Sequence, residues 1–235
     1  MQQPTTVLRI GAWLMLFARG ASWLGVLAYF LLFAGASFAI SALVASPAGA
    51  YALTGRYTFL LASIAQYALW ALIALFLARR LGEGPARTAW GTWAALAAVY
   101  FVVGIVPPGL AQGVIAERLQ DDPQWVFPAT TGFTLFWNAA VFPLLVWLIA
   151  AAHGGRRVGL RGIVTWLAEP GFGLWALYIV LLLASLLLDL AVTHVLGTEA
   201  STQAGMLAGQ FVAALRTAAT VLFAIAAWRE FAAAG

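Results

Sequence analysis

Cysteine and lysine are both missing from this 235-residue chain, and charged residues make up only 9% of it. Without cysteine the chain has no disulfide, no thiol nucleophile and no thiolate ligand for a metal. Without lysine it has no amine for Schiff-base chemistry, which excludes a retinal protein. Soluble domains carry about 25% charged residues, so a chain with 64% hydrophobic residues is not an ordinary soluble protein.

Signals for catalysis and metal binding are equally sparse. The chain has two histidines, His153 and His194, and they lie at opposite ends of predicted membrane spans. They are therefore too far apart to hold a metal or haem together. The sequence contains no H-E-x-x-H motif, phosphate-binding glycine loop or nucleophile elbow. We expect no catalytic residue, no metal site and no cofactor.

Long hydrophobic runs dominate what is present. A membrane-spanning helix needs about 20 apolar residues, and six runs approach or exceed this length. They cover residues 20–45, 57–78, 89–106, 129–151, 172–193 and 204–228. The first run is too long for the core of a secretory signal, which has about 7–15 residues. We therefore predict an all-α integral membrane protein, with residues 1–235 forming a single six-helix transmembrane domain.

The arginines predict the orientation of this domain. Nine of the twelve lie in the N-terminal tail, the second and fourth loops and the C-terminal tail: Arg9, Arg19, Arg79, Arg80, Arg87, Arg156, Arg157, Arg161 and Arg229. Basic residues remain on the cytoplasmic side, so we expect both termini in the cytoplasm and the chain in the inner membrane. The arginines are spread over several loops and form no single patch, which argues against nucleic-acid binding.

Two connecting segments have the composition of short helices. Proline cannot continue helical hydrogen bonding, so Pro107-Pro108-Gly109 is expected to end the third span, with residues 110–119 forming an interfacial helix. Residues 159–167 combine Arg161 with four large apolar side chains, which suits a helix in the headgroup layer. Both segments are interpreted first as tethers that fix the angles of the spans.

The last two runs each contain a charged residue. Asp189 lies in the fifth run and Arg216 lies near the middle of the sixth. An arginine there costs roughly 2.5–3.5 kcal/mol on insertion scales, so an ion pair between the two is a natural prediction. Such a pair either fixes helix register or serves a functional site. A small-residue face formed by Gly205, Gly209 and Ala213 lies beside Arg216 and predicts close helix packing.

Other polar residues occur at middle and outer depth. Thr131, Thr134 and Asn138 share one face of the fourth run, while Gln66 and Gln210 lie in the second and sixth. Each alone is more often an interhelical hydrogen bond than a ligand contact. Together they predict a polar cavity open to the outside. The candidate ligand-binding residues are Asn138, Asp189, Arg216, Gln66 and Gln210.

These features lead us to expect a non-enzymatic membrane protein that binds a small or lipidic ligand, in the manner of a transporter component. Its loops are too short for a nucleotide-binding domain, so ATP-driven activity would need a separate ATPase. The alternative is an accessory subunit that docks partner membrane proteins. A membrane enzyme ranks third. An open cavity at Asn138, Asp189 and Arg216 would favour the first hypothesis, and tight packing there the second.

Overall fold

The computed structural model describes residues 6–45, 52–82, 90–153, 159–168, 173–195 and 203–234. These residues form helices and short turns, with no strand among them. In chain order the helices are α1 (Thr6–Phe17), α2 (Gly20–Ala45), α3 (Ala52–Leu81), α4 (Trp90–Tyr100), α5 (Val106–Arg118), α6 (Val126–His153), α7 (Leu160–Leu167), α8 (Leu174–Val195) and α9 (Gln203–Ala234).

Five segments of the described chain are long and apolar enough to cross a membrane. They are Gly20–Ala39, Leu61–Leu81, Trp90–Arg118, Val126–His153 and Gly205–Ala233. Helix α8 is also apolar, but its described apolar stretch, Leu174–Leu188, is shorter. A helix satisfies its own backbone hydrogen bonds and is therefore stable in lipid. The chain is an all-helical, multi-pass membrane bundle.

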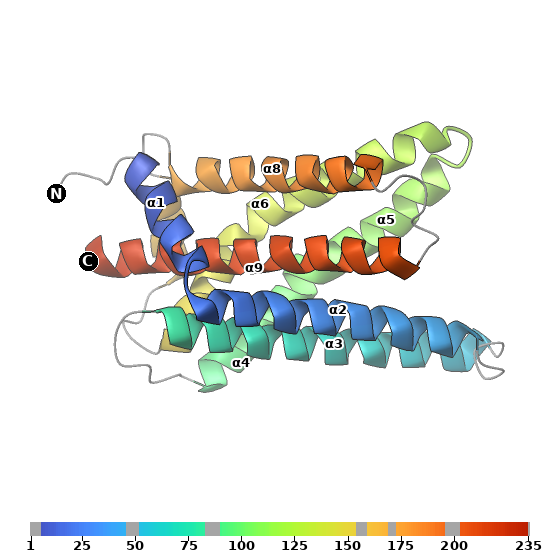
Figure 1. Cartoon of the computed structure of the whole chain (residues 1–235), viewed down its shortest axis with the longest axis horizontal. Helices are drawn as coiled ribbons and strands as arrows, with labels where there is room; N and C mark the ends of the chain where they lie inside the picture. The colour runs from blue at the N-terminus through green and yellow to red at the C-terminus, as the bar shows by residue number, and fades with distance from the viewer. Residues whose placement is uncertain are drawn as a thin grey trace.

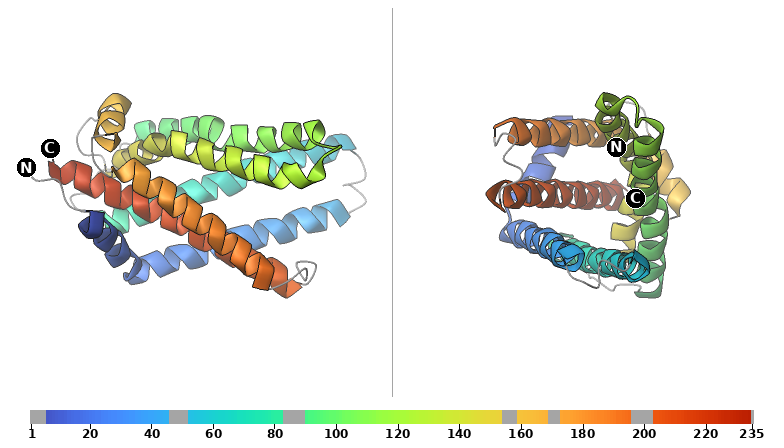
Figure 2. Two further views of the ribbon diagram at one scale, coloured as in Figure 1. Left: turned by 90° about the horizontal axis from the view of Figure 1, so that it is seen from above. Right: turned by 90° about the vertical axis from the view of Figure 1, so that its right-hand side faces the viewer.

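Helix α9 occupies the centre of this bundle, where it packs against α1, α2, α3, α6 and α8. The long helices lie side by side, and α1 begins at the end of the bundle where α9 finishes (Figure 1). Helices α6 and α8 are close together where α8 begins and diverge toward the other end (Figure 2). We call the half of the bundle in which α6 and α8 lie close together the packed half.

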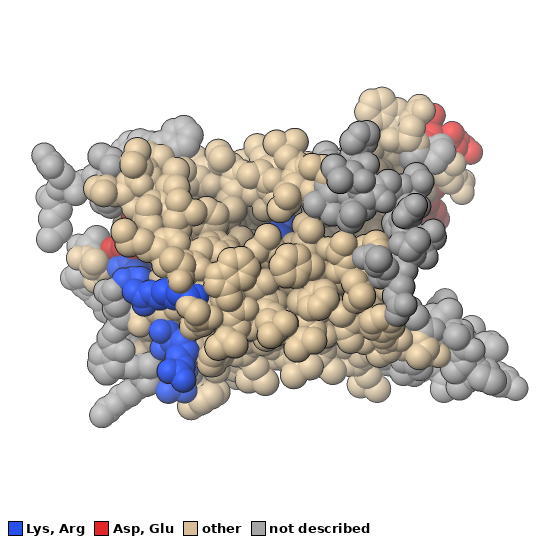
Figure 3. All heavy atoms as spheres, in the orientation of Figure 1, with Lys and Arg blue, Asp and Glu red and all other residues tan. Residues whose placement is uncertain are grey.

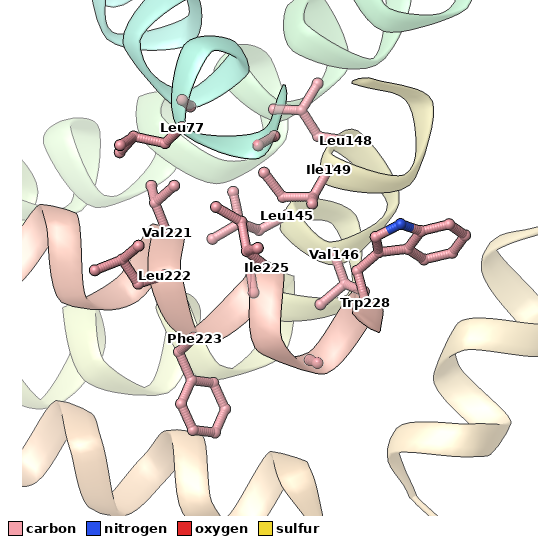
Figure 4. Close-up of a cluster of buried hydrophobic side chains, with 14 of the residues drawn as sticks. Leu77, Leu145, Val146, Leu148, Ile149, Val221, Leu222, Phe223, Ile225 and Trp228 are labelled. Carbon is pink, nitrogen blue, oxygen red and sulfur yellow. The ribbon is translucent and has the colours of Figure 1, made fainter. Parts of the chain in front are cut away.

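The packed half contains the hydrophobic core. In α9 every residue from Val221 to Trp228 is buried, and in α6 the buried residues all lie between Val141 and His153. Leu145 and Ile149 of α6 meet Ile225 of α9 there (Figure 4). Lipid tails are as apolar as leucine, so these contacts stabilise the bundle chiefly through close packing. In contrast, α5 has no buried residue.

The two ends of the bundle differ in charge. One end, which we call the arginine end, carries Arg9, Arg19, Arg79, Arg80, Arg161 and Arg229 on the described helices and turns. The other, the acidic end, carries Glu117, Asp121 and Asp122 beside Arg118. Arginine side chains gather at one end of the face in Figure 3, and acidic groups lie at the opposite corner.

The prediction that Pro107-Pro108-Gly109 ends the third span is wrong. The helix continues from Trp90 to Arg118 through a π-helical turn, Phe101–Ile105, so residues 110–119 are not a separate interfacial helix. Both prolines occupy the first positions of α5. The Val103 carbonyl would accept from residue 107 in an α-helix or 108 in a π-helix. Both are proline, and the indole Nε1 of Trp137 donates to it instead, at 2.7 Å.

Two short helices lie outside the long ones. Helix α7 confirms the prediction of a short helix at residues 159–167, with Ile163 and Leu167 buried and Arg161 exposed. Helix α1 was not predicted, because it falls in a segment interpreted as a tail. It packs against α9, and the Arg9 Nε lies 3.4 Å from the Glu230 Oε2. Both of these side chains are largely buried.

Candidate ligand-binding cavity

A cavity of about 430 Å³ opens in the half of the bundle nearer the acidic end. Helices α5, α6, α8 and α9 contribute its lining: Gln112, Phe127, Thr130, Thr131, Thr134, Leu135, Asn138, Leu182, Leu186 and Arg216. Binding sites for small molecules have volumes of about 300–1,000 Å³ and few polar groups. This cavity, which we call the outer cavity, has a suitable size and composition for a ligand.

Helix α6 supplies most of the polar lining. Thr130, Thr134 and Asn138 are spaced four residues apart, which places them on one helical face. The Thr130 hydroxyl donates to the Val126 carbonyl and the Thr134 hydroxyl donates to the Thr130 carbonyl, both at 2.8 Å. A hydroxyl that donates to its own helix still has oxygen lone pairs to offer. These two threonines therefore present hydrogen-bond acceptors to the cavity.

Arg216 supplies the positive charge of the cavity. It lies midway along α9, is exposed, and lines the outer cavity together with Asn138. The structure thus brings together two of the residues that the sequence singled out. An arginine in a membrane span usually faces the bundle interior or a water-filled cavity, so the open space accounts for how this charge is tolerated. Arg216 also interacts with other groups of the protein.

The predicted partner of Arg216 lies beyond what the structure describes. Asp189 follows Leu182 and Leu186 on α8 by seven and three residues, but its side chain is outside the described residues. Helices α8 and α9 do pack against each other. The Asp189–Arg216 ion pair remains a prediction.

A second, inner cavity of about 210 Å³ adjoins the first. It lies among α3, α4, α6, α8 and α9 and is lined by Trp70, Tyr100, Ile105, Asn138, Tyr178, Leu182, Arg216, Thr217, Thr220 and Val221. Asn138, Leu182 and Arg216 line both cavities. These three side chains therefore form the boundary at which the two spaces meet.

Aromatic rings make up one side of the inner cavity, and they are already stacked on one another. Trp70 stacks with Tyr100 at a centroid distance of 5.5 Å and with Tyr67 at 5.3 Å. Tyr178 stacks with Phe142 at 3.9 Å and shares a side-chain hydrogen bond with Thr220. The ring faces engaged in these stacks are not available to a ligand.

The two glutamines predicted as ligand contacts lie elsewhere. Gln210 donates from Nε2 to the Ser37 hydroxyl at 2.8 Å, a hydrogen bond that joins α9 to α2. Gln66 is half-buried on α3 and lines neither cavity. The hydrogen bond of Gln210 fits the alternative interpretation of intramembrane polar residues, which is interhelical contact.

Proline leaves another carbonyl without its helical donor near the site. Pro143 has no N–H, so the Ala139 carbonyl loses its partner four residues later. The Trp175 Nε1 of α8 donates to this oxygen at 2.6 Å. In the same way, the indole of Trp137 donates to the Val103 carbonyl, whose helical donor is also replaced by proline. The Asn138 side chain is therefore not needed as a donor for this carbonyl, and it lines both cavities.

Two glycines, Gly25 and Gly82, pack closely against side chains of other helices. A Cβ added at Gly25 would lie 2.7 Å from Leu77 Cδ2, and one added at Gly82 would overlap the ring of His153. Gly209 is exposed and has open space at the position of a Cβ. Close packing along Gly205, Gly209 and Ala213 therefore stays a prediction, without a close neighbour at Gly209.

Several lining residues escaped sequence reasoning, among them Thr130, Gln112, Tyr100 and Tyr178. Gln112 lies on the continuation of the third span beyond Pro108, a stretch that the prolines assigned to the surface. Tyr100 and Tyr178 lie in uniformly apolar runs, and their positions in the sequence give no sign of a role in a cavity.

Within the described ranges no group of three His, Asp or Glu side chains suits a metal ion. His153 is buried at the arginine end, remote from both cavities, and its Nδ1 contacts the Ile149 carbonyl.

Comparison of the chain with known protein families, with curated proteins and with solved structures yields no match in any of the three.

Proposed function

We propose that this protein is a non-enzymatic membrane protein that binds a small or lipidic ligand in the outer cavity and acts as a transporter component. The observation that carries this proposal is the 430 Å³ cavity at Asn138 and Arg216, inside a bundle of apolar helices. Open polar space accommodates the charge of Arg216 in either kind of protein, and the volume of this space also lies in the range of small-molecule binding sites. A ligand site needs that space.

The proposal includes six spans, with α8 as the fifth crossing. Its 22 residues suffice for a membrane core of about 30 Å at 1.5 Å per residue. An even number of crossings agrees with α1 beginning and α9 finishing at the same end. That end carries most of the described arginines, which the positive-inside rule assigns to the cytoplasm. The outer cavity then faces away from the cytoplasm, in the inner membrane.

The alternative is an accessory subunit that assembles with other membrane proteins. It would need Asn138 and Arg216 to be packed against neighbouring side chains, and the two cavities argue against this. A membrane enzyme needs a nucleophile beside a base, and the described lining residues include no histidine or carboxylate for that role. Transport driven by ATP would require a separate ATPase chain.

Native mass spectrometry of the gently extracted protein tests the proposal directly. We expect one equivalent of bound small molecule or lipid in the parent protein. Asn138→Leu should fold and lose that ligand, because it fills polar space with apolar bulk. Gln66→Leu is the matched control, since it removes an intramembrane amide outside both cavities, and it should retain the ligand.

Two results would contradict the proposal. A parent protein without any bound molecule, but with stoichiometric partner chains, would support the accessory-subunit alternative. Retention of the ligand by a correctly folded Asn138→Leu variant would remove the cavity from consideration as its binding site.

A further inference from the structure

We propose that the ligand of this site is an anionic amphiphile whose charged group sits against Arg216 and Asn138, where the outer and inner cavities meet. This inference rests on the proposed function and specifies the chemistry of the ligand. The hydrocarbon part lies along Leu182 and Leu186 of α8, in the space where α6 and α8 diverge.

Charge is the first argument. Arg216 lines both cavities, and the described lining residues of neither cavity include an acidic side chain. Arg216 has contacts within the protein, and a guanidinium has five N–H donors, so one side chain can serve both these contacts and a ligand. The Asn138 amide adds two more at the same boundary. Donors of this kind bind carboxylate and phosphate oxygens strongly.

The threonines of α6 further restrict which head groups fit the site. Thr130 and Thr134 donate to their own helix and so offer acceptors to the cavity. An anion with no hydrogen of its own leaves these oxygens without a donor. A head group that joins an anion to hydroxyl or ammonium donors satisfies both sides of the site. Phosphatidylglycerol has this chemistry, whereas phosphatidylcholine carries no hydrogen-bond donor.

The shape of the site favours a lipid over a free anion. The inner cavity, at about 210 Å³, has the volume of roughly seven water molecules at 30 Å³ each. That is room for a head group alone. The larger outer cavity adds Phe127, Leu135 and Leu186 as apolar lining. A molecule with both a polar and an apolar part fits the pair of cavities better than inorganic phosphate does.

The test uses the full, delipidated chain in detergent, titrated by native mass spectrometry. Its probes are phosphatidylglycerol, phosphatidylcholine with the same acyl chains, and glycerol phosphate. We expect phosphatidylglycerol to fill one site about tenfold or more tightly than phosphatidylcholine. Both lipids carry a phosphate, but only phosphatidylglycerol adds a net negative charge and hydroxyl donors for the threonines, and one or two such hydrogen bonds imply a factor of this size. Glycerol phosphate should bind far more weakly, because it lacks the hydrocarbon part.

Three variants localise the effect. Arg216→Gln should lower the affinity for phosphatidylglycerol about tenfold or more and that for phosphatidylcholine by a smaller factor, because the choline ammonium offsets the charge of its phosphate. Arg118→Gln, which removes an exposed arginine at the acidic end, is the matched control and should bind like the parent. Asn138→Asp preserves side-chain size and adds a negative charge, so it should repel the anion even if Arg216→Gln does not fold.

The outcomes separate this inference from the proposed function. Equal binding of the two lipids, or full phosphatidylglycerol binding by folded Arg216→Gln, would overturn the anionic head group while leaving cavity binding intact. Equal binding of glycerol phosphate and phosphatidylglycerol would overturn the amphiphile and assign the site to a free anion. No saturable binding of any probe, together with no co-purifying ligand, would overturn the proposed function itself.

Discussion

The hydrogen bond from Trp175 to the carbonyl of Ala139 gives the sharpest prediction about stability. Trp175→Phe removes the indole N–H that lies 2.6 Å from this oxygen. Because Pro143 supplies no N–H, the carbonyl is then left without its donor. An unsatisfied buried acceptor costs about 1–3 kcal/mol. Interhelical bonds in membranes average about 0.6 and reach about 1.7 kcal/mol, so we expect a loss of about 1.5 kcal/mol.

A double-mutant cycle with Pro143→Ala isolates this effect from the loss of ring volume. Alanine restores the N–H that bonds the Ala139 carbonyl within α6, so Trp175→Phe should then cost only its packing contribution. The coupling energy should be about 1 kcal/mol. The measurement is the free energy of unfolding in mixed micelles, with far-ultraviolet circular dichroism reporting helix content.

Trp13→Phe is the matched control. Its indole donates to the Ala219 carbonyl at 3.3 Å, but that carbonyl lies inside the regular helix α9 and has the helical donor of residue 223. Its loss should cost well under 1 kcal/mol, the usual net value of such a bond. If Trp175→Phe costs the same with and without Pro143, the indole does not compensate for the proline.

Three further predictions concern topology, the ion pair and packing at the arginine end. The chain has no native cysteine, so Arg161→Cys should resist a membrane-impermeant thiol reagent in whole cells and Asp122→Cys should react; the reverse pattern would refute the proposed orientation. Asp189→Ala and Arg216→Ala should each destabilise the protein, and the double variant should recover part of the loss, because removing one partner leaves a charge in low dielectric; strictly additive losses would show that the two do not interact. Gly82→Ala should lower stability by about 1–3 kcal/mol through overpacking, since its Cβ would overlap the buried histidine ring at the end of α6; unchanged thermal stability would show that the ring moves freely.

Much of the architecture follows from the sequence because it depends on local properties. Runs of about 20 apolar residues with few charges require helices in a membrane. Short-range spacing also placed Thr131, Thr134 and Asn138 on one face of the fourth run, and all three line the outer cavity. Arg216 was found in the same way, because a charge within an apolar run stands out.

Only the tertiary structure decided which polar groups meet. Gln210 and Gln66 look alike in sequence, but Gln210 is hydrogen-bonded to Ser37, 173 residues away, and Gln66 lines neither the outer nor the inner cavity. The spacing of residues along one helix determines which of them share a face. It does not determine which other helix that face contacts, so these assignments could not be predicted from the sequence.

Pro107 and Pro108 show most clearly why the sequence alone could not predict which elements continue and which groups meet. From the sequence alone, Pro107 and Pro108 remove two backbone donors and end a helix. In the folded chain a π-helical turn absorbs the misfit, and Trp137 of a different helix supplies a donor to Val103. The sequence determined that this protein is a helical membrane bundle with a charge inside it. Contacts between distant segments decided that the third span continues, that Gln112 therefore reaches the outer cavity, and where the open space around Arg216 lies.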